Sequence, residues 1–422
     1  MKAITGILIF LSCLTSVTAQ RICGSDNYTA ALLKSNPALQ AAYQDAENQI
    51  KKTTAKSNLR FRDTAQNELI NIPVVIHVIY KTAVQNISDA QIQSQLISLN
   101  NDFAGINADR ANTPKVFRPL AADVRIKFCI AQVDPRGNKT TGIIRKYSNT
   151  EVFFADDAMK FNNRGGDDAW DSKRYLNIWV CALGGRSLGY AAIPGGPSDV
   201  DGVVIAYDAF GTTGTLRPLF NKGRTATHET GHWMGLKHVW GDTDCGDDGV
   251  DDTPRQKSYN YGCPSFPHIT SCSVDERGDM FMNYMDFSDD ACMNMFTYGQ
   301  KNRMRALFAK GNLRNSFLVS FACDSNLAQG GALPDTAAKV VAPALVKIYP
   351  NPAESAITIQ CKTASKLALQ PLQIFTVTGT KVYAATLSSE ETRFAISFLT
   401  PGLYIVKVGE GKDATTSKLI KK

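Results

Sequence analysis

Apolar side chains occur with two different spacings along the chain. Residues 69–82 (LINIPVVIHVIYKT) form a nearly continuous β-branched run, which is typical of a strand buried on both faces. Residues 87–103 (ISDAQIQSQLISLNNDF) place apolar side chains at helical spacing and predict an amphipathic helix. Further apolar runs are predicted to be strands at residues 124–134, 174–183 and 201–210. These elements predict one α/β domain over residues 59–322.

The flanking regions have a different character. Residues 20–58 are polar and helix-prone, with too few large apolar side chains to form a core of their own. Residues 323–344 are rich in Pro, Gly and Ala and are predicted to be a linker. Short runs with a period of two, separated by turn residues, then fill residues 345–422 and predict a small all-β sandwich.

The first residues resemble an export signal. A lysine near the start precedes an apolar run from Ile4 to Leu14, and small residues precede a predicted cut after Ala19. The run is too short to span a bilayer, and no later stretch is long and apolar enough to do so. We therefore expect residues 1–19 to be a signal peptide and the protein to be secreted.

Charge and cysteine content narrow the function classes. The 46 Lys and Arg residues exceed the 39 Asp and Glu residues by 7, but they form no dense basic block, which argues against a nucleic-acid partner. Ten cysteines, less Cys13 in the predicted signal peptide, leave nine. In an oxidising compartment most of these should pair, and at least one should remain free.

One stretch, ATHETGHWMGLKHVWGD, holds three of the five histidines. His228 and His232 are four residues apart, so on a helix, expected over residues 224–236, they project from one face. Gly235 then allows a left-handed backbone that ends the helix and turns His238 back toward the pair. Three imidazoles with a fourth position open are typical of a catalytic zinc site.

Glu229 directly follows the first histidine, where it can act on a metal-bound water. A bare HExxH pattern arises by chance fairly often. The extended pattern HExxHxxGxxH, from His228 to His238, specifies five residues at fixed spacing. It favours a zinc site over a helix with incidental histidines.

The extended pattern resembles the metzincin metalloproteases, and the NYMDFSDD segment beginning at residue 283 resembles the Met-turn of the pappalysin family. The resemblance covers roughly residues 60–322 and extends to the N-terminal segment. It implies a metzincin-type α/β catalytic domain in which Met285 forms an apolar floor under the zinc. Glu229 would take a proton from the zinc-bound water and deliver it to the leaving amine. Met280 and Met282 are interpreted as ordinary core residues.

The sequence departs from this family at Phe287. Similar enzymes carry a tyrosine there, which stabilises the oxyanion, whereas phenylalanine has no hydroxyl. Either zinc alone carries that charge, or another donor such as Tyr284 takes part, although we expect Tyr284 to face the core.

Two acidic features have roles implied by the resemblance. The second acid of the Asp289–Asp290 pair would lie at the base of the S1′ pocket and select arginine, then lysine, after the cut, because a carboxylate pairs bidentately with guanidinium. Asp289 is expected to be solvated. The loop 241–254 (GDTDCGDDGVDDTP) holds six aspartates, which suit either a solvated loop or calcium. The resemblance favours calcium, with the likeliest ligands Asp248, Asp251 and Thr253.

The cysteines of the loop-rich half allow three pairings from sequence alone. The resemblance favours Cys245–Cys272 and Cys263–Cys292. No pairing is assigned to Cys129, Cys181, Cys323 or Cys361.

Cys23 lies in QRICGSD, before the polar helical segment. Its thiolate could occupy the open zinc position and keep the enzyme latent, as similar zymogens do. The alternative is a disulfide with another cysteine. Activation would then require cleavage after the pro-region 20–58, near Arg60 or Arg62, and an enzyme that cuts before arginine could perform it on itself.

The C-terminal segment resembles the sorting domain of type IX secretion, with VKIYPNPAESAITI, FTVTGTKV, PGLYIVKV and KLIKK in order. A generic adhesive sandwich is the alternative. The resemblance implies a secretion-machinery partner and release outside the cell or attachment to the bacterial surface. We expect a monomeric, latent zinc endopeptidase acting on proteins and peptides, with a role in virulence. A narrow-specificity processing protease and an adhesin with a vestigial zinc site are alternatives.

Overall fold

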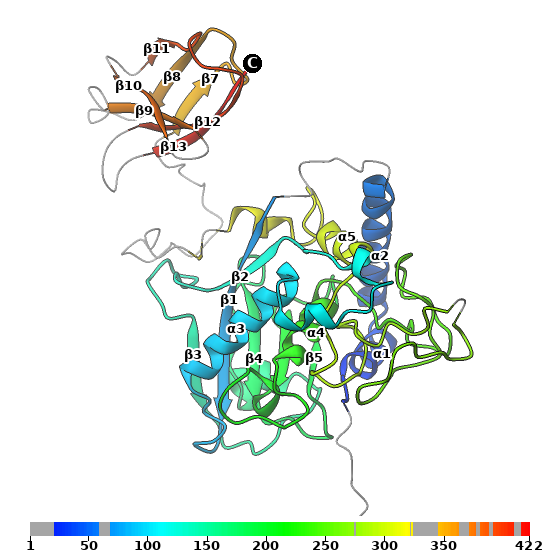
Figure 1. Ribbon diagram of the computed structural model, residues 1–422. Coiled ribbons are helices and arrows are strands. Elements are labelled where there is room, and N and C mark those ends of the chain that lie inside the picture. The colour runs from blue at the N-terminus through cyan, green and yellow to red at the C-terminus, as the bar shows by residue number, and fades with distance from the viewer. Residues whose placement is uncertain are drawn as a thin grey trace, which may run out of the picture. The chain divides into compact units, whose positions relative to one another are not determined.

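The computed structural model describes residues 21–58, 68–273, 276–320, 322–323, 345–362, 371–376, 380–387, 391–408 and 415–422. The chain divides into two compact units, Met1–Leu333 and Pro334–Lys422, which we describe one at a time (Figure 1). The predicted signal peptide, Arg60 with Arg62, and nearly all of the predicted linker lie outside the described residues. Within those residues no helix is long and apolar enough to cross a membrane.

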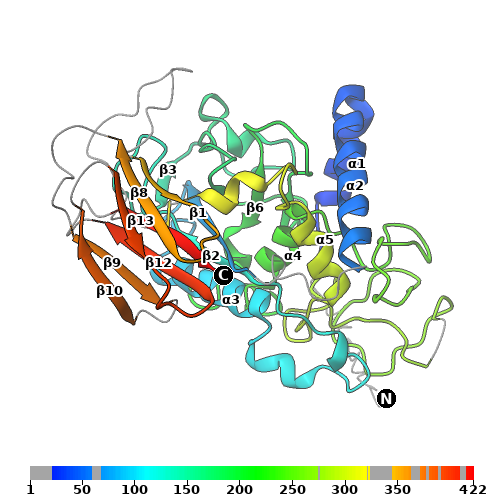
Figure 2. The same ribbon diagram turned by 90° about the horizontal axis from the view of Figure 1, so that it is seen from above.

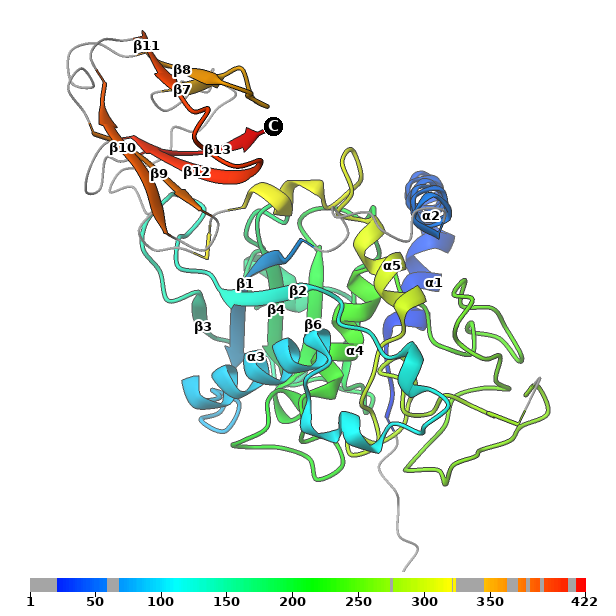
Figure 3. The same cartoon turned by 45° about the horizontal axis from the view of Figure 1, so that its top comes forward.

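A six-stranded mixed sheet forms the centre of the first unit (Figure 3). Its strands are β1 (Ile70–Tyr80), β2 (Ile126–Ile130), β3 (Ile143–Tyr147), β4 (Leu176–Cys181), β5 (Gly189–Ala191) and β6 (Gly202–Ala206). The order is β2-β1-β4-β6-β5, and β3 also pairs with β1. Every pairing is parallel except that of β5 with β6. Because β5 lies at an edge, its outer side offers backbone groups to another segment.

Both faces of the sheet are covered, which explains the uninterrupted apolar runs. One face packs against the helices through one set of alternating side chains, including Ile72, Val74, Ile178, Val180, Val203 and Ile205. The other face forms a separate cluster that includes Ile79, Trp179, Cys181, Val204 and Ala206. In the central strands, the side chains of consecutive residues therefore enter different cores.

Three helices belong to the body of the first unit: α3 (Asp89–Ala104), α4 (Arg224–Trp233) and α5 (Tyr298–Ala306). Ser88 caps α3 by accepting a hydrogen bond from the amide of Gln91, and Thr297 with Gln300 forms a capping box on α5. Short 3-10 helices occupy Ala108–Asn112, Arg118–Leu120, Ala158–Lys160, Asn162–Arg164, Tyr207–Ala209 and Asn315–Val319.

The polar N-terminal segment folds into two helices, α1 (Ser25–Ser35) and α2 (Pro37–Asn58), and α2 lies beside α5 (Figures 1 and 2). Glu47 of α2 accepts a hydrogen bond from the Arg303 guanidinium at 2.5 Å, and both side chains are buried. Ile50 is also buried, in the main core. The segment is therefore ordered by the surface of the catalytic unit and not by a core of its own.

The second unit consists of two antiparallel sheets. One has the strand order β10-β9-β12-β13 and the other β11-β8-β7. Apolar side chains from both sheets form one core, including Ile357, Ile359, Ile374 and Val406. The strands are β7 (Leu345–Tyr349), β8 (Ala356–Lys362), β9 (Pro371–Thr376), β10 (Lys381–Thr386), β11 (Glu391–Ala395), β12 (Gly402–Val408) and β13 (Thr415–Lys421). This is the all-β architecture expected from the period of two.

Candidate active site

Helix α4 carries His228, Glu229 and His232 on one short, buried segment. Gly231 sits where a Cβ atom would meet the sulfur of Met285 at 2.6 Å, so glycine is what permits the methionine to lie against the helix. The helix ends at Trp233, three residues before the expected end. Gly235 follows with φ +82°, a left-handed conformation that turns the chain.

The turn brings the third imidazole to the other two. The Nε2 atom of His232 lies 3.1 Å from the Nε2 atom of His228 and 3.0 Å from that of His238. The distance between the Nε2 atoms of His228 and His238 is 3.3 Å. The three ring nitrogens thus converge on one point.

The opposite ring nitrogens hold the imidazoles in place. The Nδ1 atom of His228 is 2.7 Å from the Tyr284 carbonyl oxygen. That of His232 is 2.9 Å from the Leu236 carbonyl oxygen. Burial lowers the pKa of His228 well below its usual value and lowers that of His232 to about 4. Both rings are therefore neutral near pH 7, which is the form that binds a metal.

Cys23 completes the cluster from the N-terminal segment. Its Sγ atom and one ligand atom from each of the three histidines all lie within 4.8 Å of one another. Backbone bonds hold it against the edge strand: the Gly24 amide donates to the Gly189 carbonyl at 2.8 Å and the Leu188 amide donates to the Ile22 carbonyl at 3.0 Å. Three imidazole nitrogens and one thiol sulfur are a donor set that fits zinc.

The carboxylate of Glu229 lies beside Cys23 and contacts the N-terminal segment. It accepts a hydrogen bond from the Ser25 hydroxyl at 2.9 Å, and the Cys23 Sγ atom is 3.5 Å away. Burial raises the pKa of Glu229 to about 7. The side chain is a proton acceptor poised beside the ligand cluster.

The aromatic residues around the histidine cluster differ in how far they are exposed to solvent. Phe287 packs its ring 4.9 Å from that of His238 and 5.5 Å from that of Tyr259, which is 43% exposed. Tyr284 is fully buried, with its ring centre 5.3 Å from the Arg224 guanidinium, so it faces the core. Phe287 has no hydroxyl to offer an oxyanion, and the Tyr284 ring lies in the core against Arg224.

A buried acidic pocket lies beside the histidines. Asp290 is fully buried, and its Oδ2 atom accepts the backbone amides of Lys222 at 2.8 Å and Arg224 at 3.2 Å. Its other oxygen forms an ion pair with the guanidinium of Arg21, which is 2% exposed. The Arg21 Nε atom also donates to the Ser288 carbonyl at 3.2 Å. Asp289, in contrast, is only partly buried.

Arg21 is a site residue that the sequence analysis missed. It lies two positions before Cys23, so the two enter adjacent parts of the site. The sequence did carry a signal for this contact: a basic residue stands close to Cys23, and Asp290 was already expected to bind arginine.

The expected calcium residues lie around one cavity of about 320 Å³, which Asp248, Asp251 and Thr253 all line. Both carboxylate oxygens of Asp248 accept the Thr253 hydroxyl at 2.9 Å. Burial raises the pKa of Asp248 to about 7. The cavity is lined by several aspartates, and the Asp248 carboxylate accepts hydrogen bonds from Val250 and Thr253 of the same loop.

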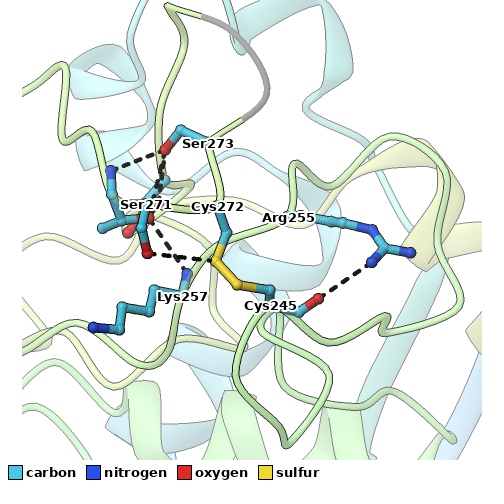
Figure 4. Close-up of a disulfide and its surroundings, with 8 residues drawn as sticks. Cys245, Arg255, Lys257, Ser271, Cys272 and Ser273 are labelled. Atoms are coloured by element: carbon cyan, nitrogen blue, oxygen red, sulfur yellow. Dashed lines mark hydrogen bonds between the residues drawn. A yellow bond between two sulfur atoms is a disulfide. The ribbon is translucent and has the colours of Figure 1, made fainter.

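The described residues of the first unit contain three disulfides: Cys129–Cys323, Cys245–Cys272 and Cys263–Cys292. The last two are the pairs that the resemblance favours, and Figure 4 shows Cys245–Cys272 with the Arg255 side chain donating to the Cys245 carbonyl at 3.2 Å. Cys129 and Cys323 had no assigned partner. Among the described side chains Cys23 and Cys181 are free and buried, while the Cys361 side chain lies outside them.

The site defines a class of protein: a metallopeptidase in which a short helix with two histidines and a glutamate is followed by a third histidine and underlain by methionine. Comparisons with known proteins agree. The family model described as pregnancy-associated plasma protein-A matches residues 160–309, and the model of the secretion system C-terminal sorting domain matches residues 347–422.

Relatives with similar sequences are extracellular metalloproteases. One from Pyricularia oryzae is 30% identical over 297 residues, covering 68% of this chain and 88% of its own length. One from Podospora anserina is 32% identical over 300 residues, with the same coverage.

Solved structures extend the similarity. Mature mirolysin of Tannerella forsythia, in complex with a cleaved peptide, is 50% identical, with a TM-score of 0.60 over 62% of this chain and 99% of that chain. A promirolysin mutant of the same organism is 46% identical, with a TM-score of 0.65 over 71% of this chain and 97% of that chain.

The chain belongs to the pappalysin family of metallopeptidases and carries a type IX sorting domain. It is a metalloendopeptidase that is secreted or held at the cell surface, and its family implies a catalytic metal.

Proposed function

We propose that the protein is a latent zinc endopeptidase that cuts on the amino side of arginine, and less readily of lysine. The observation that carries this proposal is Arg21, whose guanidinium fills the Asp290 pocket while Cys23 lies among the three histidines. The N-terminal segment thereby places an arginine side chain on the carboxylate that we propose selects substrate arginine, although its chain runs in the direction opposite to that of the proposed substrate. Lysine suits it less, because a compact ammonium cannot pair bidentately with the carboxylate.

In the proposed mechanism the metal is zinc, bound by His228, His232 and His238. Zinc supplies Lewis-acid chemistry, polarising the scissile carbonyl and making a water molecule more acidic. Glu229 takes the proton of the attacking water and carries it to the leaving amine. Its position directly after His228 and beside the cluster of possible metal ligands suits both the acceptance and the return of that proton. Met285 supports the helix from below and does not ligate.

Latency follows from three contacts of the same segment. Cys23 would serve as a fourth ligand in place of water, Ser25 donates a hydrogen bond to the Glu229 carboxylate, and Arg21 pairs with the proposed specificity residue Asp290. We propose the corresponding division of the chain into signal peptide 1–19, pro-region 20–58, catalytic domain 59–322, linker 323–344 and sorting domain 345–422. Cleavage near Arg60 or Arg62 would release the pro-region.

We also propose that calcium binds the acidic loop through Asp248, Asp251 and Thr253. The cavity of about 320 Å³ that these residues line supports the proposal, and so does the strong burial of the Asp248 carboxyl. Displacement of the loop's internal hydrogen bonds by a cation would remove repulsion between neighbouring aspartates.

The test of the catalytic assignment combines metal removal with one substitution. A chelator should abolish cleavage of an arginine-containing peptide by the mature enzyme, and added zinc should restore it. Glu229→Ala should retain one zinc ion by metal analysis and lose activity by roughly 100-fold or more, since general acid–base catalysis contributes about that much. Comparable cleavage by the variant would show that another group is the base.

A further inference from the structure

Helix α1 buries one tyrosine in the catalytic unit, away from the metal ligands. Tyr28 is 5% exposed and belongs to the apolar cluster on the sheet face opposite α4, together with Trp179, Leu188 and Tyr190. Leu32, one turn further along α1, packs against the same cluster. The peptidase mechanism uses none of these side chains.

The Tyr28 hydroxyl binds the Asp157 carboxylate, which residues of the catalytic unit also contact. Its hydroxyl donates to the Asp157 Oδ2 atom at 2.7 Å, while the Tyr190 hydroxyl donates to the Oδ1 atom at 3.0 Å. Lys160, fully buried, lies 2.8 Å from the same carboxylate and donates to the Val200 carbonyl at 2.8 Å. The Oδ1 atom of Asp157 thus binds Tyr190 and Lys160, and the Oδ2 atom accepts the hydrogen bond from the Tyr28 phenol.

The walls of this pocket are aromatic and cationic. The Lys160 ammonium lies 5.3 Å from the Trp179 ring centre, 4.9 Å from that of Tyr190 and 5.4 Å from that of Tyr28. The Tyr28 and Tyr190 ring centres are 4.8 Å apart. An electron-rich ring therefore gains both a tilted aromatic neighbour and a nearby cation.

Most of the pocket belongs to the catalytic unit, because only Tyr28 and Leu32 come from the proposed pro-region. Asp157 keeps its bonds from Tyr190 and Lys160, and Lys160 keeps two rings and the Val200 carbonyl. What is lost is the donor to the second Asp157 oxygen and the ring that fills the space. We therefore expect the mature enzyme to retain the space that Tyr28 fills, with one Asp157 oxygen that has lost its phenol donor.

The path of the N-terminal segment places this pocket relative to the cut. The segment runs from Arg21 in the Asp290 pocket to Cys23 at the histidines and then along the edge strand β5. There the Ala191 amide donates to the Ser25 hydroxyl at 3.0 Å. Along this path, Tyr28 follows the metal cluster and Arg21 precedes it. If Asp290 binds the residue after the scissile bond, the Tyr28 pocket serves residues before it.

We propose that in the mature enzyme the pocket formed by Asp157, Lys160, Leu188, Trp179 and Tyr190 binds a tyrosine side chain of the substrate on the amino side of the scissile bond. This inference rests on the proposed release of the pro-region and on cleavage before arginine. Tyrosine is preferred over phenylalanine because only a phenol supplies the donor for Asp157. A site built for a hydrogen bond rejects the analogue that lacks it.

The experiment uses the mature enzyme and peptides of equal length, each with arginine after the cut. Tyrosine, phenylalanine or alanine is placed in turn at each of the five positions before the residue that donates the scissile carbonyl. At one of these positions, tyrosine should raise kcat/KM by about 10-fold or more over phenylalanine, the size expected for a hydrogen bond to a charged group. Asp157→Asn should reduce that tyrosine-to-phenylalanine ratio to near one.

A matched control is Asp156→Asn, which makes the same chemical change at an adjacent exposed carboxylate that pairs with Arg164. This variant should keep the ratio. Equal rates for tyrosine and phenylalanine at every position in the wild type would overturn the pocket, whether or not the Asp157 variant folds, and leave Tyr28 as an anchor of latency only. A preference that persists in Asp157→Asn would overturn the assignment to this carboxylate. Failure to cut any arginine peptide would instead overturn the proposed function, and the pocket with it.

Discussion

Cys23 and Arg21 enter the candidate active site from one short N-terminal stretch, and we propose that they block it in different ways. The thiol lies with the metal ligands, whereas the guanidinium fills the acidic pocket. In the proposed mechanism, the first contact would exclude the attacking water, and the second would exclude the substrate side chain. Latency in this account is therefore shared between two side chains.

Substitution of Cys23 by alanine tests the first contact. The precursor should become active faster than wild type, by about 10-fold or more, since each 1.4 kcal/mol of lost binding is a factor of ten. The measurement is the lag before peptide cleavage by purified precursor. Cys181→Ala is the matched control, because Cys181 is also free and buried but lies in the sheet and not in the ligand cluster. An unchanged lag for Cys23→Ala would remove the thiol from the latency mechanism.

Local spacing predicted that the three imidazoles meet, because His228 and His232 share one helical face and Gly235 shapes the turn to His238. The partner of Asp290 was not predictable in the same way. Arg21 is 269 positions away, and no periodicity connects two residues at that separation. The Asp157 pocket escaped for the same reason, since its parts come from α1, β4, β5 and a 3-10 helix.

At the scale of elements, the N-terminal segment depends on the catalytic unit for its order. Its low apolar content correctly indicated that it has no core, and α2 accordingly buries Ile50 and Glu47 against its neighbour. The short edge strand β5 was not predicted, because three residues show no alternation. That strand nevertheless carries the backbone groups that bind residues 22–24. Helix α5, β3 and β13 were also missed, since their patterns are short or largely polar.

Glu47→Ala tests whether α2 maintains latency. The change leaves the buried Arg303 guanidinium without its carboxylate, a loss of roughly 3–5 kcal/mol for a pair of this kind. The precursor should therefore activate faster. The mature enzyme should match wild type in kcat/KM, because residue 47 belongs to the pro-region whose release we propose. Lys51→Ala, on the exposed side of α2, should leave the lag unchanged. A Glu47→Ala precursor with wild-type latency would show that the docking of α2 is dispensable.

At the scale of the whole molecule, the change from mixed periodicity to a period of two predicted the division into a catalytic unit and a β-sandwich. The Cys129–Cys323 disulfide was beyond the sequence analysis, because four cysteines without local partners allow several pairings. In the structure it joins β2 to the chain that leaves the catalytic fold. The roles of the two units follow from different evidence: the metal site defines the peptidase, and the sorting-domain match defines the export signal.

The most direct test of the account is a cleavage-site profile of the mature enzyme on a denatured protein mixture, comparing wild type with Asp290→Asn and Asp289→Asn. Wild type should cut before arginine and less often before lysine. Asp290→Asn removes the charge that pairs with guanidinium, a loss of roughly 2–5 kcal/mol, so the arginine preference should collapse while slow cleavage elsewhere persists. Asp289→Asn, at the partly exposed neighbour, should keep the wild-type profile. Retention of the arginine preference by Asp290→Asn would contradict the account, because the pocket that Arg21 fills in the precursor would then not be the one that selects substrates.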